Sequence, residues 1–95
     1  MLRGVKDMKV KIYNVGYIKK FFEPDVDIDF ENEILGDKEE ALKLYEVFKE
    51  EAKELIDGEE EENIYKKIED RDFNISDEFN SYCVWFMVKK IDVRK

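Results

Sequence analysis

Apolar and polar residues alternate with a period of two near the start of the chain. From Lys9, Val10 and Ile12 alternate with Lys9, Lys11 and Tyr13, so the segment from residue 9 to about residue 15 predicts a half-buried strand. Gly16 then predicts a turn or a bulge. The segment 17–23 predicts a short, irregular strand, which Pro24 closes because the residue before a proline is restricted to extended conformations.

The clearest alternation lies in residues 24–33, PDVDIDFENE, where a carboxylate occupies every second position from Asp25 to Glu33. An extended chain would place these acids on one side and the residues between them on the other. The period is therefore that of a strand and not of a helix. The apolar side of the predicted strand carries Val26, Ile28 and Phe30.

A helical period follows and gives the strongest element of the chain. Asp37 and Glu40 resemble a capping box with Asp in the Ser/Thr place. The apolar stripe behind them predicts an amphipathic helix over about residues 38–57, and Gly58 is the residue expected just after its end. The stripe consists of Ala41, Leu44, Tyr45, Phe48, Ala52, Leu55 and Ile56.

The next segment, EEEENIYKKIED, begins with four glutamates and continues with Ile64, Tyr65 and Ile68. Acids are favoured in the first turn of a helix, where the dipole attracts negative charge. The segment predicts a second short helix over about residues 60–69. The alternative is a disordered acidic run.

The C-terminal part predicts strands. RDFNIS predicts a short strand with a turn around Asp77, and SYCVWFMVKKIDV is the longest β-type run. Both sides of residues 82–88 are apolar, so we expect a central strand that is covered on each side. The second cover is the second helix, the N-terminal strands, or a second copy of the chain in a homodimer through residues 82–88. One side carries Tyr82, Val84, Phe86 and Val88, and the other Cys83, Trp85 and Met87.

These elements predict an α+β fold: a small antiparallel or mixed sheet of four to five strands, with the long helix (about 38–57) and the second short helix (about 60–69) packed on it. A chain of 95 residues suits one compact core. We therefore expect a single domain over residues 1–95, with residues 1–7 a frayed N-terminal extension.

Composition excludes several kinds of chemistry. The chain has no His, Thr or Gln and a single Cys. Without His, the usual general base of a triad hydrolase and the commonest zinc ligand are missing. Cys83 lies in a strand predicted to be buried, which favours an inert core thiol over a redox role. No apolar run approaches the ~20 residues of a membrane span and no signal-peptide pattern is present, so we expect a cytoplasmic protein. The Lys/Glu-rich composition favours a thermophile.

Charge is distributed unevenly along the chain. Residues 1–20 carry a net charge of +5, residues 21–70 carry −14 and residues 71–95 carry +1, for a total of −8. The acidic total opposes nucleic-acid binding, since phosphate recognition rests on clustered Lys and Arg. The acidic middle favours a basic protein partner instead.

The acidic row is the candidate metal site. Side chains on one side of a strand repeat every ~6.6 Å, so neighbouring carboxylates can lean toward one Ca²⁺. The row is not an EF-hand, because Phe30 and Gly36 occupy the positions that require Gly and Glu. The alternative is a solvated strand face beside Lys9 and Lys11. The predicted calcium ligands are Asp25, Asp27, Asp29 and Glu31.

In size, acid-rich composition and α+β pattern, the chain resembles small uncharacterised proteins of methanogenic archaea, for which an acidic pocket that binds calcium has been described. The resemblance is one of overall character; it implies an archaeal source and Ca²⁺ and assigns no residue. The sequence therefore predicts an acidic, non-enzymatic binding module that binds calcium or another divalent cation weakly. The alternative is an interaction or regulatory module that docks onto a basic partner. A third class, an enzyme with Asp and Glu as acid and base, is less favoured.

Overall fold

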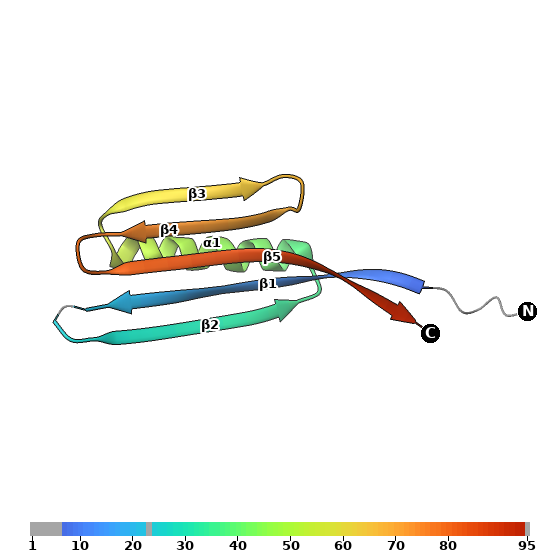
Figure 1. The fold of residues 1–95 in the computed structure, drawn as a ribbon, viewed down its shortest axis with the longest axis horizontal. Coiled ribbons are helices and arrows are strands. Elements are labelled where there is room, and N and C mark those ends of the chain that lie inside the picture. Colours follow the sequence, from blue (N-terminus) through green and yellow to red (C-terminus); the bar gives the residue numbers. More distant parts are fainter. Residues whose placement is uncertain (1–6, 23, 95) are drawn as a thin grey trace, which may run out of the picture.

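The computed structural model of the chain describes residues 7–22 and 24–94. In the described part, five strands form one antiparallel sheet in the order β2-β1-β5-β4-β3, and one helix lies across one face of it (Figure 1). The α+β prediction is confirmed, and the sheet is antiparallel. Apart from Asp7, where β1 begins, the predicted extension over residues 1–7 lies outside the described residues. The elements are β1 (Asp7–Phe21), β2 (Asp27–Leu35), α1 (Lys38–Leu55), β3 (Glu59–Tyr65), β4 (Asp70–Ser76) and β5 (Ser81–Arg94).

β1 is one continuous strand, so the predicted break at Gly16 is wrong. β1 pairs with β5 along most of its length and with β2 from Tyr13 to Phe21. Ladder hydrogen bonds on both sides hold the backbone extended through the glycine. The segment 17–23, predicted as a separate irregular strand, is the second half of β1.

The predicted second helix at residues 60–69 is also wrong, because residues 59–65 form β3. β3 pairs with β4 from Glu59 to Tyr65. The preference of acids for a first helical turn is worth only about 0.3–1 kcal/mol, and the ladder to β4 outweighs it. The extended chain also points Glu62 toward α1, where Tyr45 and Lys49 donate hydrogen bonds to its carboxylate.

α1 begins where the sequence predicts and ends two residues earlier. The Asp37 carboxylate caps the helix by accepting a hydrogen bond from the backbone N–H of Glu39, 3.3 Å away. Ile56, in an extended conformation, is the C-terminal cap. Gly58 therefore lies beyond the cap and does not end the helix. Glycine is required at this position for another reason, since a Cβ would collide with the carbonyl of Ser76 in β4.

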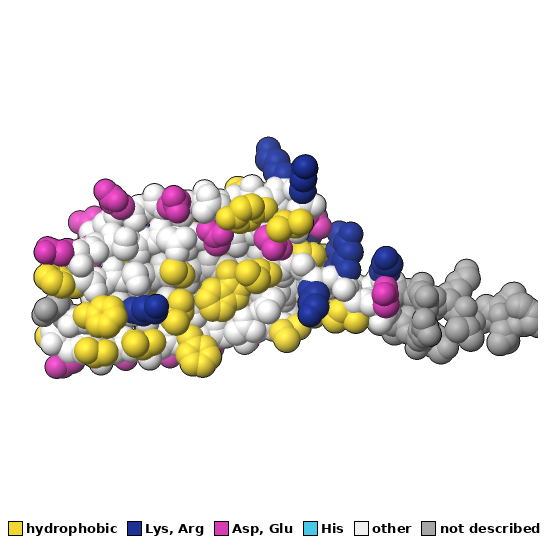
Figure 2. Space-filling model, in the orientation of Figure 1, with side chains coloured by type: hydrophobic (Ala, Val, Ile, Leu, Met, Phe, Trp, Pro, Cys, Tyr) yellow, Lys and Arg dark blue, Asp and Glu magenta, His cyan; other side chains and the backbone are white. Residues whose placement is uncertain are grey.

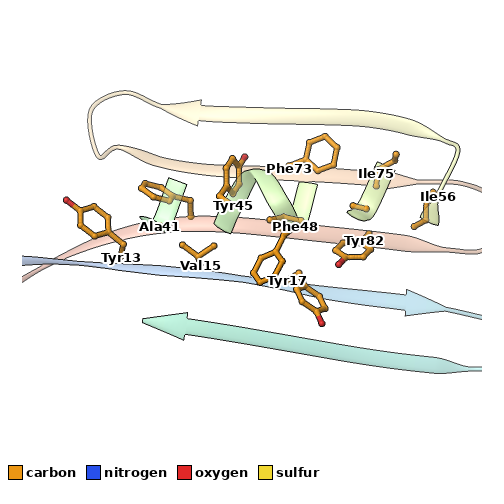
Figure 3. Close-up of a cluster of buried hydrophobic side chains, with 13 residues drawn as sticks. Tyr13, Val15, Tyr17, Ala41, Tyr45, Phe48, Ile56, Phe73, Ile75 and Tyr82 are labelled. Atoms are coloured by element: carbon orange, nitrogen blue, oxygen red, sulfur yellow. The ribbon is translucent and has the colours of Figure 1, made fainter. Parts of the chain in front are cut away.

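The core lies between α1 and the sheet (Figure 3). Aromatic rings dominate it: Tyr17 meets Phe48 edge-on with ring centres 4.9 Å apart, and Tyr13 lies 5.7 Å from Phe86. Such pairs add about 0.5–1.5 kcal/mol to the burial of their surface. The buried residues of the core are Tyr13, Val15, Tyr17, Ala41, Tyr45, Phe48, Ala52, Ile56, Phe73, Ile75, Tyr82, Val84 and Phe86.

β5 occupies the centre of the sheet, as its two apolar sides predict. The turn before it is also as predicted, since the Asp77 carboxylate accepts hydrogen bonds from the backbone N–H groups of Phe79 and Asn80. The expected second cover over β5 is absent from the described residues. α1 covers one face, while the second helix does not exist and β1 lies beside β5 in the sheet.

Candidate functional site

The acidic row lies on β2, an edge strand. Asp27, Asp29 and Glu31 point to the side of the sheet that carries α1, because they share rows with the core-facing residues of β1, whereas Asp25 precedes the strand. All four are exposed. α1 packs mainly over β1 and β5, so water reaches the edge strand even on the helix side.

The cation beside the row is Lys19, and the prediction of Lys9 and Lys11 is wrong. β2 pairs with the second half of β1, which places Lys19 opposite Asp29. The Lys19 ammonium lies 3.7 Å from the Asp29 carboxylate, which also accepts a hydrogen bond from the Tyr17 hydroxyl at 3.4 Å.

Within residues 7–22 and 24–94, no group of three or more His, Cys, Asp or Glu side chains is placed to hold a metal ion. Alternate carboxylates of an extended strand stand ~6.6 Å apart, which is too far for three of them to share one ion at ~2.4 Å. Calcium binding by the row stays a prediction.

The opposite side of the sheet carries an extended apolar surface. In Figure 1, β4 and β5 pass in front of α1, so Figure 2 shows the face that the helix leaves uncovered; yellow side chains gather there over β2, β1 and β5. The most exposed are Ile28 (54%), Phe30 (70%), Ile34 (64%) and Met87 (48%). We call this surface the open apolar face; it consists of Val10, Ile12, Ile18, Ile28, Phe30, Ile34, Cys83, Trp85, Met87 and Ile91.

Across the open side of the sheet, the side chains change from acidic to apolar. The strand register aligns one residue from each strand in a row. From β3 to β2, one such row reads Glu61, Asn74, Cys83, Ile18, Phe30, and the next reads Asn63, Asp72, Trp85, Gly16, Asn32. The open apolar face is therefore bordered along β3 and β4 by polar residues and carboxylates.

Trp85 lies flat at the centre of the open apolar face. Its indole N–H donates to the side-chain oxygen of Asn32, 3.0 Å away on β2, so the ring crosses β1 above Gly16. A Cβ at Gly16 would lie 2.6 Å from the indole ring and would collide with the carbonyl of Glu31. Glycine is therefore the residue that lets the indole rest on the backbone and form a fixed apolar platform.

Two further residues distinguish this face from a finished core. The buried side-chain oxygen of Asn14 has no hydrogen-bond donor among the described residues, and Asn14 lies between Ile34 and Met87 in its row. Cys83, predicted in the core, lies half-buried on the open apolar face. Burial raises the pKa of its thiol, which keeps it protonated and agrees with an inert cysteine.

The strongest electrostatic interactions lie on the covered side and serve the fold. Lys49 is 8% exposed, and its ammonium lies 2.8 Å from the Glu62 carboxylate and 3.3 Å from that of Glu46. Burial raises the pKa of Tyr45, and its hydrogen bond to Glu62 raises it further. Burial lowers the pKa of Lys49, but hydrogen bonds to Glu62 and Glu46 outweigh it, and the net shift is upward. This cluster fastens β3 to α1.

The chain has no match among protein-family models, curated proteins or solved structures. In the part that the structure describes, no helix has both the length and the apolar character needed to cross a membrane.

The sequence pattern predicted only part of this face. It indicated a second apolar side of β5 with Cys83, Trp85 and Met87 but not the contribution of Ile18, Asn32 and Ile34. The signal was present, because the alternation of residues 24–33 continues to Ile34 and Ile18 has the opposite phase to Tyr17.

Proposed function

We propose that this chain is a non-enzymatic interaction module that binds a protein partner through the open apolar face. The observation that supports this function is a contiguous apolar surface on three neighbouring strands, with Phe30 and Ile34 mostly exposed. Three strands at about 4.8 Å spacing, each roughly 30 Å long, give several hundred Å². Apolar patches of this size usually mark binding surfaces.

The partner is a basic amphipathic helix. α1 covers β1 and β5 on the opposite side, and a second helix on this side would complete a three-layer arrangement. A helix of about 20 residues spans roughly 30 Å, the length of the face. Its apolar side would lie on Trp85 and Phe30, and its Lys and Arg residues would meet Glu61 and Asp72 on the acidic border.

Charge disfavours a second copy as the partner. Each chain carries a net charge of −8, so two copies repel each other as they approach. In the described part, the strand register places two lysines on the open side of the sheet. They are Lys20 and Lys89, which lie in rows near the two ends of the open apolar face. A second copy therefore offers little positive charge to the acidic border, whereas a basic helix offers it along its whole length.

A model peptide tests the proposal. We would titrate the protein with a Leu/Lys amphipathic helical peptide of about 20 residues and follow Trp85 fluorescence. We expect binding in the micromolar range that weakens about tenfold between low and high salt, since the contacts on the border are exposed. The same peptide with Glu in place of Lys should bind at least tenfold more weakly.

Substitutions assign the binding to the face. Phe30→Ser together with Ile34→Ser should weaken binding of the Lys peptide at least tenfold. Val47→Ser is the matched control, because Val47 is a similarly exposed apolar residue on α1 and its change should have no effect. Equal losses in the two variants would overturn the function. A dimer that forms without peptide and dissolves in the double variant would assign the face to a second copy and overturn the basic partner.

Weak cation binding by the acidic row is the second, weaker proposal. In its favour, Asp27, Asp29 and Glu31 lie on one exposed side of an edge strand. Against it, the Lys19 ammonium neutralises part of the charge of Asp29. Such a site would hold an ion through two carboxylates and water.

A further inference from the structure

Cations gather at one end of this acidic molecule, around the turn that joins β3 to β4. The turn carries Lys66 and Lys67, α1 begins beside it at Lys38, and β4 brings Arg71. The remaining members come from β1 and the last part of β5. We call this group the cationic end; it consists of Lys11, Lys38, Lys66, Lys67, Arg71, Lys89 and Lys90.

Two cavities of about 350 and 360 Å³ open at the cationic end, and Glu69 lines both. Volumes of this order suit small ligands. The first cavity combines three cations with two apolar side chains and one acid, a composition that differs sharply from the acidic border of the sheet. Its walls are Lys38, Ile64, Lys66, Glu69, Arg71 and Phe86.

Arg71 is the residue of this cavity best suited to an anion. Its guanidinium lies 5.9 Å from the centre of the Phe86 ring, and among the described residues it makes no ion pair with a carboxylate. The side chain is half-buried. The Glu62 carboxylate is near enough for the charge of Arg71 to lower its pKa, but it forms no ion pair with Arg71. A guanidinium that lies over an aromatic ring and has no carboxylate within ion-pair distance can present its planar donors for a bidentate bond to phosphate.

Glu69 occupies the rim of the same cavity in a strained conformation. Its φ of 62° is in the left-handed region, which costs a residue with a side chain about 1 kcal/mol and which often marks a functional position. Its carboxylate lies 3.0 Å from the Lys11 ammonium and 3.2 Å from that of Lys38. Glu69 therefore holds two lysines at the rim, and it is the acid that an entering anion would face.

We propose that this cavity binds a small phosphorylated molecule that carries an apolar ring. Arg71 forms the bidentate bond to the phosphate group, and Lys38 and Lys66 supply two further positive charges. The ring lies against Ile64, which is half exposed, while Phe86 is buried beneath the Arg71 guanidinium and supports it. The Glu69 carboxylate weakens binding by repelling the phosphate group. The bound phosphate must therefore compete with Glu69 for the Lys38 ammonium.

The full chain, titrated with phenyl phosphate and followed by amide NMR shifts, tests the site. We expect saturable shifts at Lys38, Ile64 and Arg71 with a Kd on the order of 1 mM or lower. Inorganic phosphate should bind several-fold more weakly because it lacks the ring, and phenol should not bind because it lacks the charge.

Four variants separate a built site from general attraction to lysines. Arg71→Gln should weaken phenyl phosphate binding at least tenfold, and Lys38→Gln, an exposed change that spares the fold, about threefold. Lys20→Gln is the control for net charge, because Lys20 lies in β1 at the opposite end of the sheet; it should leave the Kd unchanged. Glu69→Gln should tighten binding about threefold by removing the repelling charge.

The proposal fails if phenyl phosphate shifts lysine amides over the whole surface without saturation. It also fails if Lys38→Gln weakens binding no more than Lys20→Gln does. A Glu69→Gln variant that binds more weakly would overturn the role assigned to Glu69, since the carboxylate would then be needed to build the site.

Discussion

The two faces of this sheet are built from the same five strands but differ in the burial of their side chains. On the helix side, Phe86 is 1% exposed and packs against rings from β1 and α1. On the other side, its neighbour Met87 is 48% exposed. Two adjacent residues thus lie on a covered and an uncovered side, so burial here is decided by where the single described helix lies and not by the hydrophobicity of the strands. The open apolar face has the apolar composition of a core, but no described element covers it.

Substituting the two neighbours tests this comparison with the largest expected effect. Phe86→Ala removes a ring that touches Tyr13 and Tyr45, and we expect a loss of about 3–5 kcal/mol in the free energy of unfolding. Met87→Ala should cost less than about 1 kcal/mol, because the side chain is half in water already. Urea unfolding of both variants provides the measurement. Similar losses would mean that the open apolar face is covered in solution.

A second pair of neighbours on β3 compares the two faces by charge. Glu62 points to α1 and binds Tyr45 and Lys49, whereas Glu61 lies on the open side and is exposed. Glu62→Gln leaves the nearly buried Lys49 with only the exposed Glu46 as partner. We expect a loss of about 1–2 kcal/mol at neutral pH, against less than about 0.5 kcal/mol for Glu61→Gln.

The effect of Glu62 depends on pH in a defined direction. Burial raises the pKa of its carboxyl, but hydrogen bonds from Lys49 and Tyr45 outweigh burial, so the pKa lies below its ordinary value of 4.5. A lowered pKa in the folded state stabilises the protein above the unfolded pKa, and this contribution is lost as the pH falls through the folded value. The gap between the unchanged protein and Glu62→Gln should therefore close below pH 4.5. A gap that persists there would attribute the loss to packing.

Sequence patterns predicted the elements that depend on local period. The alternation from Asp27 onward identified β2, the apolar stripe and Asp37 identified α1, and the two apolar sides of residues 82–88 placed β5 at the centre. The patterns gave the wrong element where tertiary contacts determine the secondary structure. The glutamates of β3 satisfy a helix start as well as a strand, and the choice rests on the ladder to β4 and on Lys49, neither of which is visible locally.

The candidate site was only partly predictable for a related reason. Alternation shows that Phe30 and Asp29 lie on opposite sides of β2, but it cannot show which side carries the helix. The register is equally hidden: pairing with the second half of β1 brings Asp29 to Lys19, whereas the sequence favoured Lys9 and Lys11. Because β2 is an edge strand beyond the reach of α1, its acids stay in water on the covered side while its apolar residues join the open one.

The smallest expected effect concerns the acidic row on that covered side. Two carboxylates and water would bind calcium with a Kd toward 10⁻³ M, on the order of the loosely organised sites. At a calcium concentration near Kd, mass action adds about 0.4 kcal/mol to the free energy of unfolding. We expect calcium to raise the melting temperature slightly more than sodium at matched ionic strength, and Asp27→Asn with Asp29→Asn to remove the excess. Screening acts on both salts alike, so equal shifts would leave the row as the solvated side of an edge strand.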